Sequence, residues 1–144
     1  MNQEIKAQWV AALRSGEYRQ GSGFLRSGDN EFCCLGVLCD LAVKAKLHLN
    51  ITILNMETQS ADPDPNTRPT YKYDNDTMTL PFKVCDWAGL QSSNPYVSLT
   101  EEERRKLYSG DAFACPPSSH ITLAGCNDNG LTFEDIATVI EREL

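Results

Sequence analysis

The segment Phe32-Cys-Cys-Leu-Gly-Val-Leu-Cys-Asp-Leu-Ala42 constrains the fold most, because Asp40 is the only charged residue in it. A helix that spans a membrane needs about 18 or more apolar residues, so this segment is too short to cross a bilayer. Its spacing predicts a core helix over residues 35–47. The inner face of this helix carries Leu38, Leu41, Ala42 and Ala45.

Three of the six cysteines, Cys33, Cys34 and Cys39, lie in this apolar segment, where a thiol behaves as a small hydrophobe. No apolar segment typical of a secretory signal follows Met1, so we expect a cytoplasmic protein with reduced, buried cysteines. The cysteine spacings do not match the ligand pairs of structural zinc sites. We therefore expect no metal and no other cofactor.

The charge balance excludes one large class of function. The 144 residues include 13 Lys and Arg and 20 Asp and Glu, for a net charge of −7. A protein that grips double-stranded nucleic acid needs a broad basic face, and this composition does not supply one. No apolar stretch is long enough to place the chain in a membrane.

The remaining patterns predict further helices and short strands. Helical spacing and N-terminal capping signals indicate helices over residues 3–15, 81–88, 100–108 and 132–144. Turn formers between apolar residues predict a β-hairpin over residues 18–34, a strand over 49–54 and a second hairpin from residues 70–73 and 77–80. Residues 109–123 are expected to be irregular, and Asn127-Asp128-Asn129-Gly130 to form a turn.

These elements predict an α+β fold, a single compact domain over residues 1–144. About four helices are expected around one or two small antiparallel β-hairpins. The segment 57–78 begins with a proline-rich polar stretch, and we interpret it as a variable surface loop or hairpin insertion.

The chain resembles a family of small, mostly uncharacterised proteins of bacteriophages and prophages. The resemblance is carried by Trp9-Val-Ala-Ala-Leu-Arg-Ser-Gly-Glu-Tyr-Arg-Gln-Gly21, by the apolar segment that begins at Phe32, by Leu80-Pro-Phe-Lys-Val-Cys-Asp-Trp-Ala-Gly-Leu90 and by Asn127-Asp-Asn-Gly-Leu-Thr-Phe-Glu-Asp-Ile-Ala137. It implies a phage context, in which accessory proteins of this size often act against host defence. A family by itself does not set the chemistry.

The leading hypothesis is a non-enzymatic protein that sequesters a nucleotide immune signal, cyclic or linear, in an infected bacterial host. The first 50 residues carry six basic and five acidic side chains, whereas the last 44 carry four basic and nine acidic ones. An anionic ligand therefore meets least repulsion in the N-terminal third. Arginines, glycine N–H groups and aromatic rings suit phosphates and bases. The expected ligand-binding residues are Arg14, Tyr18, Arg19, Gln20, Gly21, Gly23 and Arg26.

Two alternatives stay open. The acidic C-terminal half suits an inhibitor that covers a basic surface of a host defence protein. A cysteine-dependent hydrolase would use Cys33 or Cys34 near a helix start, where a thiol pKa is lowered, with His48 or His120 as the base. Small binding proteins often build their sites between subunits, so a homo-oligomer is also considered.

Overall fold

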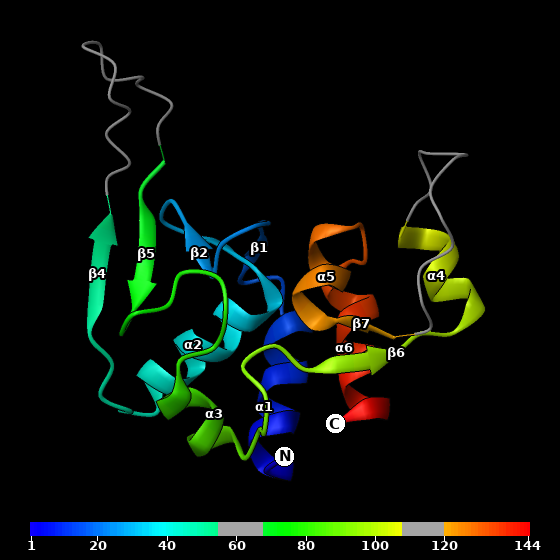
Figure 1. Ribbon diagram of the computed structural model, residues 1–144, viewed down its shortest axis with the longest axis horizontal. Helices are drawn as coiled ribbons and strands as arrows, with labels where there is room; N and C mark the ends of the chain where they lie inside the picture. The colour runs from blue at the N-terminus through cyan, green and yellow to red at the C-terminus, as the bar shows by residue number, and fades with distance from the viewer. Residues whose placement is uncertain (55–67, 108–119) are drawn as a thin grey trace.

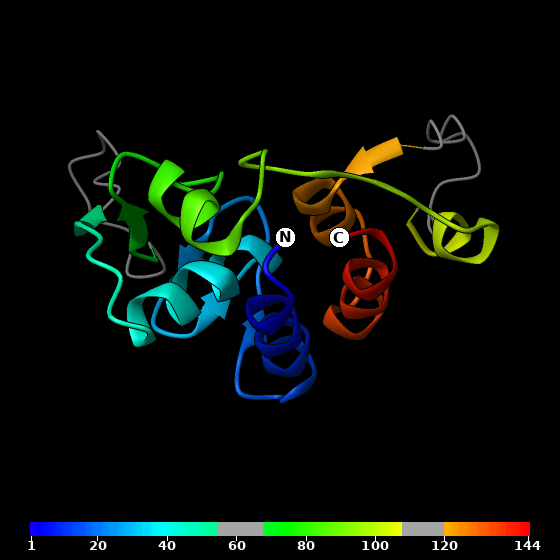
Figure 2. The same ribbon diagram turned by 90° about the horizontal axis from the view of Figure 1, so that it is seen from below.

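The helices α1 (Gln3–Arg14) and α6 (Phe133–Glu143) pack side by side and bring the two ends of the chain close together (Figures 1 and 2). The computed structural model describes residues 1–54, 68–107 and 120–144. Both helices fall within the predicted ranges. The apolar residues that predicted α1, such as Trp9 and Leu13, are buried in the core, as is the apolar stripe of α6.

Local capping explains where these two helices begin. The side-chain oxygen of Asn2 accepts hydrogen bonds from two backbone N–H groups in the first turn of α1. Thr132 and Asp135 form a capping box at the start of α6, as the sequence pattern predicted. Such caps satisfy backbone donors that have no partner inside the helix.

The apolar segment forms α2 (Cys34–Lys44), which lies at the centre of the core. It ends three residues before the predicted boundary. Trp9 of α1 is fully buried, and its indole N–H donates a 2.9 Å hydrogen bond to the carbonyl of Cys34. The first helix is thereby attached to the beginning of the second. The short helix α3 (Phe82–Ala88) packs against α2.

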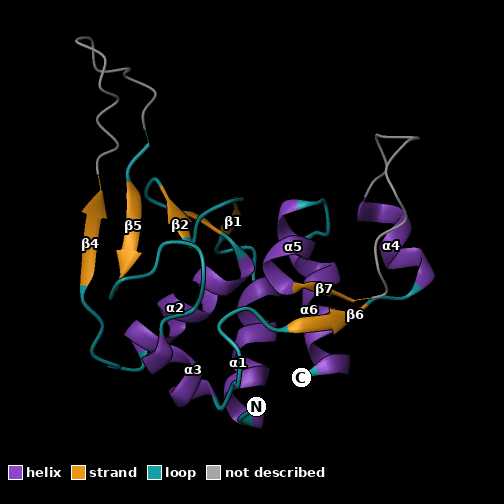
Figure 3. Cartoon of the chain, in the orientation of Figure 1, coloured by secondary structure: helices purple, strands orange, loops and turns teal. Residues whose placement is uncertain are grey.

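A five-stranded sheet lies at one end of the molecule (Figure 3). Its spatial order is β1 (Arg19–Gln20), β3 (Glu31–Phe32), β2 (Arg26–Ser27), β5 (Thr70–Tyr73) and β4 (Ile51–Leu54). β1 pairs with β3 in parallel, and the other pairs are antiparallel. The predicted hairpin over residues 18–34 is confirmed by β2 and β3, and the predicted strand over 49–54 by β4.

The predicted hairpin of residues 70–73 with 77–80 is wrong. Residues 77–80 form no strand, and only an isolated bridge joins Tyr73 to Asp76. β5 instead pairs along its whole length with β4, and residues 55–69 separate the two strands in the sequence. β5 is thus an inner strand of the sheet, whereas we expected it in a surface insertion. Residues 57–67 of that predicted insertion lie outside the described residues.

The C-terminal part contains three elements that the sequence did not predict. β6 (Tyr96–Ser98) and β7 (His120–Thr122) form a two-stranded antiparallel sheet, and β7 leads directly into α5 (Leu123–Asp128). Residues 120–123 are therefore regular, although an irregular segment was predicted. Asn127 and Asp128 end a helix, and only the residues after them form the turn. The predicted helix at 100–108 is confirmed as α4 (Glu101–Leu107).

These elements make a single compact α+β domain, and the predicted fold class is confirmed. The five described cysteines are buried free thiols, and Cys115 lies outside the described part of the chain. Within the described residues, no helix combines the length and apolar character needed to cross a bilayer.

Candidate functional site

The five-stranded sheet has an inner face that is buried in β3 and β5 but exposed at the edge strand β4, and an outer face that carries charged residues. Side chains alternate between the two faces along each strand, and the strand pairing places Phe32, Tyr71 and Tyr73 on the inner face, where all three are buried. We call the opposite side the outer face. Its residues in the strands, and Arg68 just before β5, include three cations and one carboxylate: Arg19, Ser27, Glu31, Thr52, Leu54, Arg68, Thr70 and Lys72.

Two arginines converge on one carboxylate of the outer face. Arg19 Nη1 lies 3.6 Å from Glu31 Oε1, and Arg68 Nη1 forms an ion pair with the same oxygen. The hydrogen bond from Arg68 contributes most to holding the pKa of Glu31 below its usual range. Both arginine side chains remain open to solvent, with exposed fractions of 74% and 61%.

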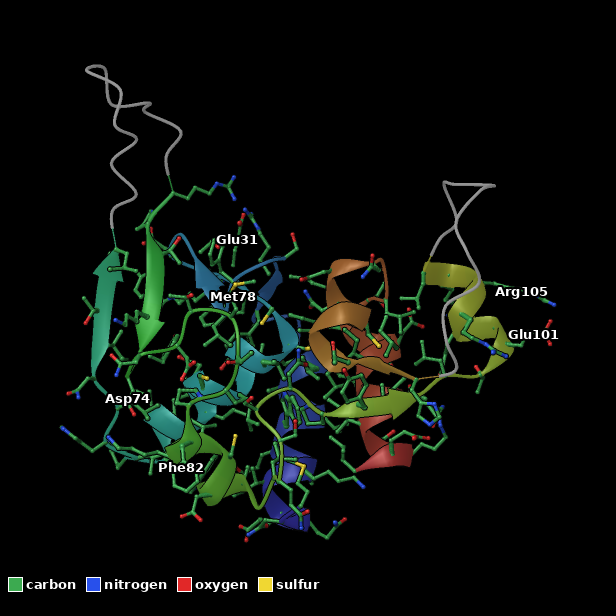
Figure 4. The ribbon with its side chains drawn as sticks, in the orientation of Figure 1. Glu31, Asp74, Met78, Phe82, Glu101 and Arg105 are labelled. Carbon is green, nitrogen blue, oxygen red and sulfur yellow. The ribbon has the colours of Figure 1, made fainter. Side chains whose placement is uncertain are left out.

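The arginine pair, Arg19 and Arg68, borders a surface hollow of about 330 Å³. Glu31 and the β2–β3 turn, residues 28–30, complete its lining (Figure 4 labels Glu31). Because a guanidinium has five N–H donors and Glu31 engages few of them, each arginine keeps donors for a second acceptor. Among the expected binding residues, Arg19 alone lines this hollow.

Arg26 lies on the other side of the sheet from Arg19. The strand pairing sets it directly opposite Phe32, and its guanidinium lies 5.0 Å from the Phe32 ring centre and 4.0 Å from that of Tyr71. Its Nη2 donates a hydrogen bond to the backbone carbonyl of Asp29. Arg26 therefore stabilises the sheet and its turn through cation–π contacts.

Arg14 and Tyr18 are also engaged within the protein. Arg14 forms ion pairs with Glu134 and Glu141 of α6 at 2.9 and 2.8 Å. The Tyr18 hydroxyl donates a 2.6 Å hydrogen bond to Asp40 and accepts one of 2.7 Å from Lys44. The ring of Tyr18 also packs edge-on against Phe32. Neither residue joins Arg19 in a common site.

Gln20 and Gly21 belong to a hydrogen-bond network centred on Asn127, which is 5% exposed. Gln20 donates to Asn127 and to the carbonyl of Leu131, and accepts from the N–H of Phe133 at 3.0 Å. Asn127 donates to the carbonyl of Gly21 at 2.7 Å and accepts from the N–H of Cys34 at 3.2 Å. The network attaches β1 to α2, α5 and α6, so the amide of Gln20 has a positioning role.

Gly23 lines a second concave region, which we call the cleft, of about 240 Å³. Gly23 adopts a positive φ of 79°, a backbone conformation that favours glycine. The cleft is bordered by loops, by the first residue before α2 and by both ends of α5 (Figure 4 labels Met78): Gly23, Cys33, Met78, Thr79, Asn94, Thr122, Ala124, Gly125 and Asp128.

Backbone donors hold three polar side chains of the cleft in place. Asn94 Oδ1 accepts from the N–H of Ala124, and Thr122 Oγ1 accepts from that of Gly125, both at 3.1 Å. Asp128 Oδ1 accepts from the N–H of Gly23 at 3.1 Å and from the Asn127 amide at 3.0 Å. Asn94 Nδ2 and Asp128 Oδ2 form no hydrogen bond to the described residues, so both remain for a ligand.

Cys33 in the cleft does not have the properties of a nucleophile. Its sulfur accepts a hydrogen bond from the N–H of Gly36 at 3.4 Å, and burial raises the pKa of the thiol to about 11. The hydrolase hypothesis required a lowered pKa. His48 and His120 are exposed, and neither lines the cleft. The described residues contain no group of three or more His, Cys, Asp or Glu that could hold a metal ion.

The sequence reasoning missed the residues that complete both concave regions. Arg68 falls at the end of a stretch that we interpreted as a loop, and Asp128 in a stretch that we interpreted as a turn. No local sequence pattern marks Asn94 or Thr122 as site residues. The hydrogen-bond partner of Asn94 lies 30 residues away, and that of Thr122 lies in α5, which the sequence did not predict.

The fold and these two regions define a small α+β domain with a hollow that carries an arginine pair and the carboxylates of Asp29 and Glu31, and with a separate polar cleft. The family described as "Domain of unknown function (DUF8296)" matches residues 1–144, and the chain belongs to this family. No curated protein and no solved structure matches the chain.

Proposed function

We propose that the protein is a non-enzymatic binder of a small nucleotide and that the arginine pair holds the phosphate groups. The observation that carries this proposal is the convergence of Arg19 and Arg68 on one oxygen of Glu31, with both guanidiniums open to solvent. Two guanidiniums that meet at one point present the donor geometry that a phosphate requires.

The charge of the outer face supports the same ligand class. Lys72 lies on the same face of the sheet as the two arginines, whereas the whole chain carries a net charge of −7. Glu31 offsets part of the positive charge and keeps two mutually repelling guanidiniums together. An arriving phosphate takes the donors that Glu31 leaves, and we expect its affinity to fall as salt screens the charges.

The proposed role is sequestration. A binder that leaves its ligand intact needs no nucleophile or base, and the raised pKa of Cys33 is consistent with such a binder. With the bacteriophage resemblance, we propose that the ligand is a nucleotide immune signal and that the protein acts in the cytoplasm of an infected host.

Native mass spectrometry with a panel of cyclic and linear nucleotides tests this proposal. We expect a stoichiometric adduct of unchanged ligand mass, weakened at least tenfold by Arg19→Ala combined with Arg68→Ala. Arg105→Ala is the matched control, because Arg105 is also 74% exposed and also pairs with a glutamate. The same spectra count subunits and so test the expected homo-oligomer.

Three results would contradict the proposal. The first is an absence of adducts across the panel at millimolar ligand. The second is conversion of the ligand to a chemically altered product by the protein. The third is a loss of ligand affinity in Arg105→Ala as large as in the variant that lacks Arg19 and Arg68. In the last case, binding would depend on overall charge rather than on the arginine pair.

The second candidate function is binding to a host defence protein. The acidic C-terminal half gives it little support, because seven carboxylates in residues 101–144 form ion pairs within the chain. A different observation favours it: β4 is the last strand of the sheet and exposes Ile51, Ile53 and Leu54 to 42%, 54% and 39%. A partner protein can extend a sheet by pairing a strand of its own with an exposed edge strand. A stable complex with a protein, lost in Ile53→Lys, would support this alternative.

A further inference from the structure

We propose that the cleft binds the ribose of the same nucleotide, with Asp128 as the acceptor for a sugar hydroxyl. This inference rests on the proposed function, because it assumes that the phosphates lie on the arginine pair. It assigns to the cleft a ligand group of defined chemistry: a neutral sugar that carries hydroxyl donors.

The polar groups of the cleft select hydroxyls over phosphates. No Lys, Arg or His is among the described residues that line it, and its one formal charge is the carboxylate of Asp128. A phosphate would be repelled there. A hydroxyl can donate to Asp128 Oδ2 and accept from Asn94 Nδ2, the two atoms that their own hydrogen bonds leave available.

These atoms are positioned before any ligand arrives. Asp128 Oδ1 is held by the N–H of Gly23 and by the amide of Asn127, so its second oxygen has a defined direction. The Oδ1 of Asn94 is held by the N–H of Ala124. A site that is fixed in this way loses little entropy on binding.

The cleft lies close enough to the arginine pair for one nucleotide to reach both. Glu31 borders the hollow and Cys33 borders the cleft, and two residues of extended chain span about 7 Å. Phe32 ends β3, and Cys33, the N-cap residue of α2, also has an extended backbone, so this spacing applies between the two regions. Gly21 packs against Glu31, where an added Cβ would lie 3.3 Å from the Cβ of Glu31.

The size of the cleft limits what enters it. About 240 Å³ corresponds to roughly eight waters of liquid volume, and drug-sized ligands occupy pockets of about 300 Å³ or more. The cleft therefore suits one sugar ring with part of a base, and the phosphates must lie outside it.

The variant Asp128→Asn separates the sugar contact from the phosphate contact. The two donors that hold Oδ1 will keep an acceptor in that position, so the new NH₂ group replaces Oδ2. The cleft then presents a donor where it presented an acceptor, with no change of shape. Asp86→Asn on the exposed surface of α3 is the matched control, because it changes the net charge by the same amount.

The experiment is isothermal titration calorimetry with the four ribonucleoside 5′-triphosphates, their 2′,3′-dideoxy counterparts and inorganic tripolyphosphate. The ribonucleotide that binds best should exceed its dideoxy form by about tenfold or more, because a site built for a hydroxyl rejects a ligand that lacks it. Asp128→Asn should remove this difference and leave tripolyphosphate affinity unchanged. Asp86→Asn should change neither, and thermal unfolding should show that both variants are folded.

The outcomes separate this inference from the proposed function. Equal binding of ribo- and dideoxynucleotides, with both weakened by Arg19→Ala and Arg68→Ala, would overturn the ribose assignment and leave the arginine pair in place. Ribonucleotide binding that is lost in Asp128→Asn but unaffected by the arginine variants would overturn the joint placement and the proposed phosphate site. Binding of none of these probes would overturn both for linear nucleotides.

Discussion

The hydrogen-bond network of Asn127 gives the sharpest test of how this fold is held together. The Asn127 side chain makes four hydrogen bonds, of 2.7–3.2 Å, to the side chains of Gln20 and Asp128 and to the backbones of Gly21 and Cys34. Asn127→Ala removes all four at once. The segments that lose this connection are β1, the start of α2 and the end of α5.

The expected cost follows from burial. The N–H of Cys34 is buried and would lose its partner, and a buried donor without a partner costs about 1–3 kcal/mol. The groups of Gln20 and Gly21 that bond to Asn127 are partly buried, and the loss of each of these two hydrogen bonds adds about 0.5–1.5 kcal/mol. We therefore expect Asn127→Ala to lower the free energy of unfolding by about 2–6 kcal/mol.

Urea unfolding followed by tryptophan fluorescence measures this change, because Trp9 bonds to the carbonyl of Cys34. The control is Asn129→Ala, an exposed asparagine whose side chain makes one hydrogen bond, to the carbonyl of Gly125. It should change stability by no more than about 0.5 kcal/mol. A double-mutant cycle with Gln20→Ala should give a coupling energy of about 0.5–3 kcal/mol.

Two results would refute this reasoning. The first is an Asn127→Ala variant no less stable than Asn129→Ala at an unchanged denaturant slope. The second is strict additivity of Asn127→Ala with Gln20→Ala, because residues in one network must couple.

Two further predictions concern α2. Gly36→Ala should prevent stable folding or cost several kcal/mol in urea unfolding, because a Cβ there would lie 1.7 Å from the backbone oxygen of Leu25; a stability within about 1 kcal/mol of wild type would show that the two segments do not approach this closely. Burial raises the pKa of Cys33 to about 11, above the value of about 8.5 expected in the unfolded chain. The contribution of the buried, neutral thiol to the free energy of unfolding is therefore complete below about pH 8.5, and it should be lost as the pH rises toward 11. Unfolding measured between pH 8 and 11 should show a shallower loss of stability in Cys33→Ser than in wild type, and identical slopes would contradict the burial of this thiol.

Local patterns predicted the helices well, because their signals lie within one or two turns. The capping box of Thr132 and Asp135, the apolar spacing of the first helix and the apolar segment of α2 each follow from residues that are neighbours in the sequence. α5 was missed because six residues with a glycine among them are too short to show helical periodicity.

The local sequence pattern, turn formers between two short strands, predicted the strand pairing correctly only for β2 and β3. A strand can pair with any other that buries the right face, and nothing near Thr70 or Tyr73 indicates that β4 is the partner. The choice depends on long-range burial, which placed Tyr71 and Tyr73 over the core. The second predicted hairpin failed for this reason.

The candidate site shows the same division. Arg19 and Gly23 were identified from residue chemistry, and the structure places one in the hollow and the other in the cleft. Four other expected residues can also contact a phosphate or a base, but residues elsewhere in the chain already bind their side chains. These are Arg14, Tyr18, Gln20 and Arg26. Sequence cannot distinguish an arginine held by distant glutamates from one that is open to solvent.

The sequence by itself determined the fold class, the main helices and the acidic character that excludes a nucleic-acid grip, because these depend on composition and on periodicities within a few residues. Only the tertiary structure decided which side chains remain available for a ligand. It brought Arg68 beside Arg19, 49 residues apart in the sequence, and turned Asp128 toward Gly23, 105 residues apart. Contacts over such separations depend on the packing of the whole core, and no local pattern encodes them.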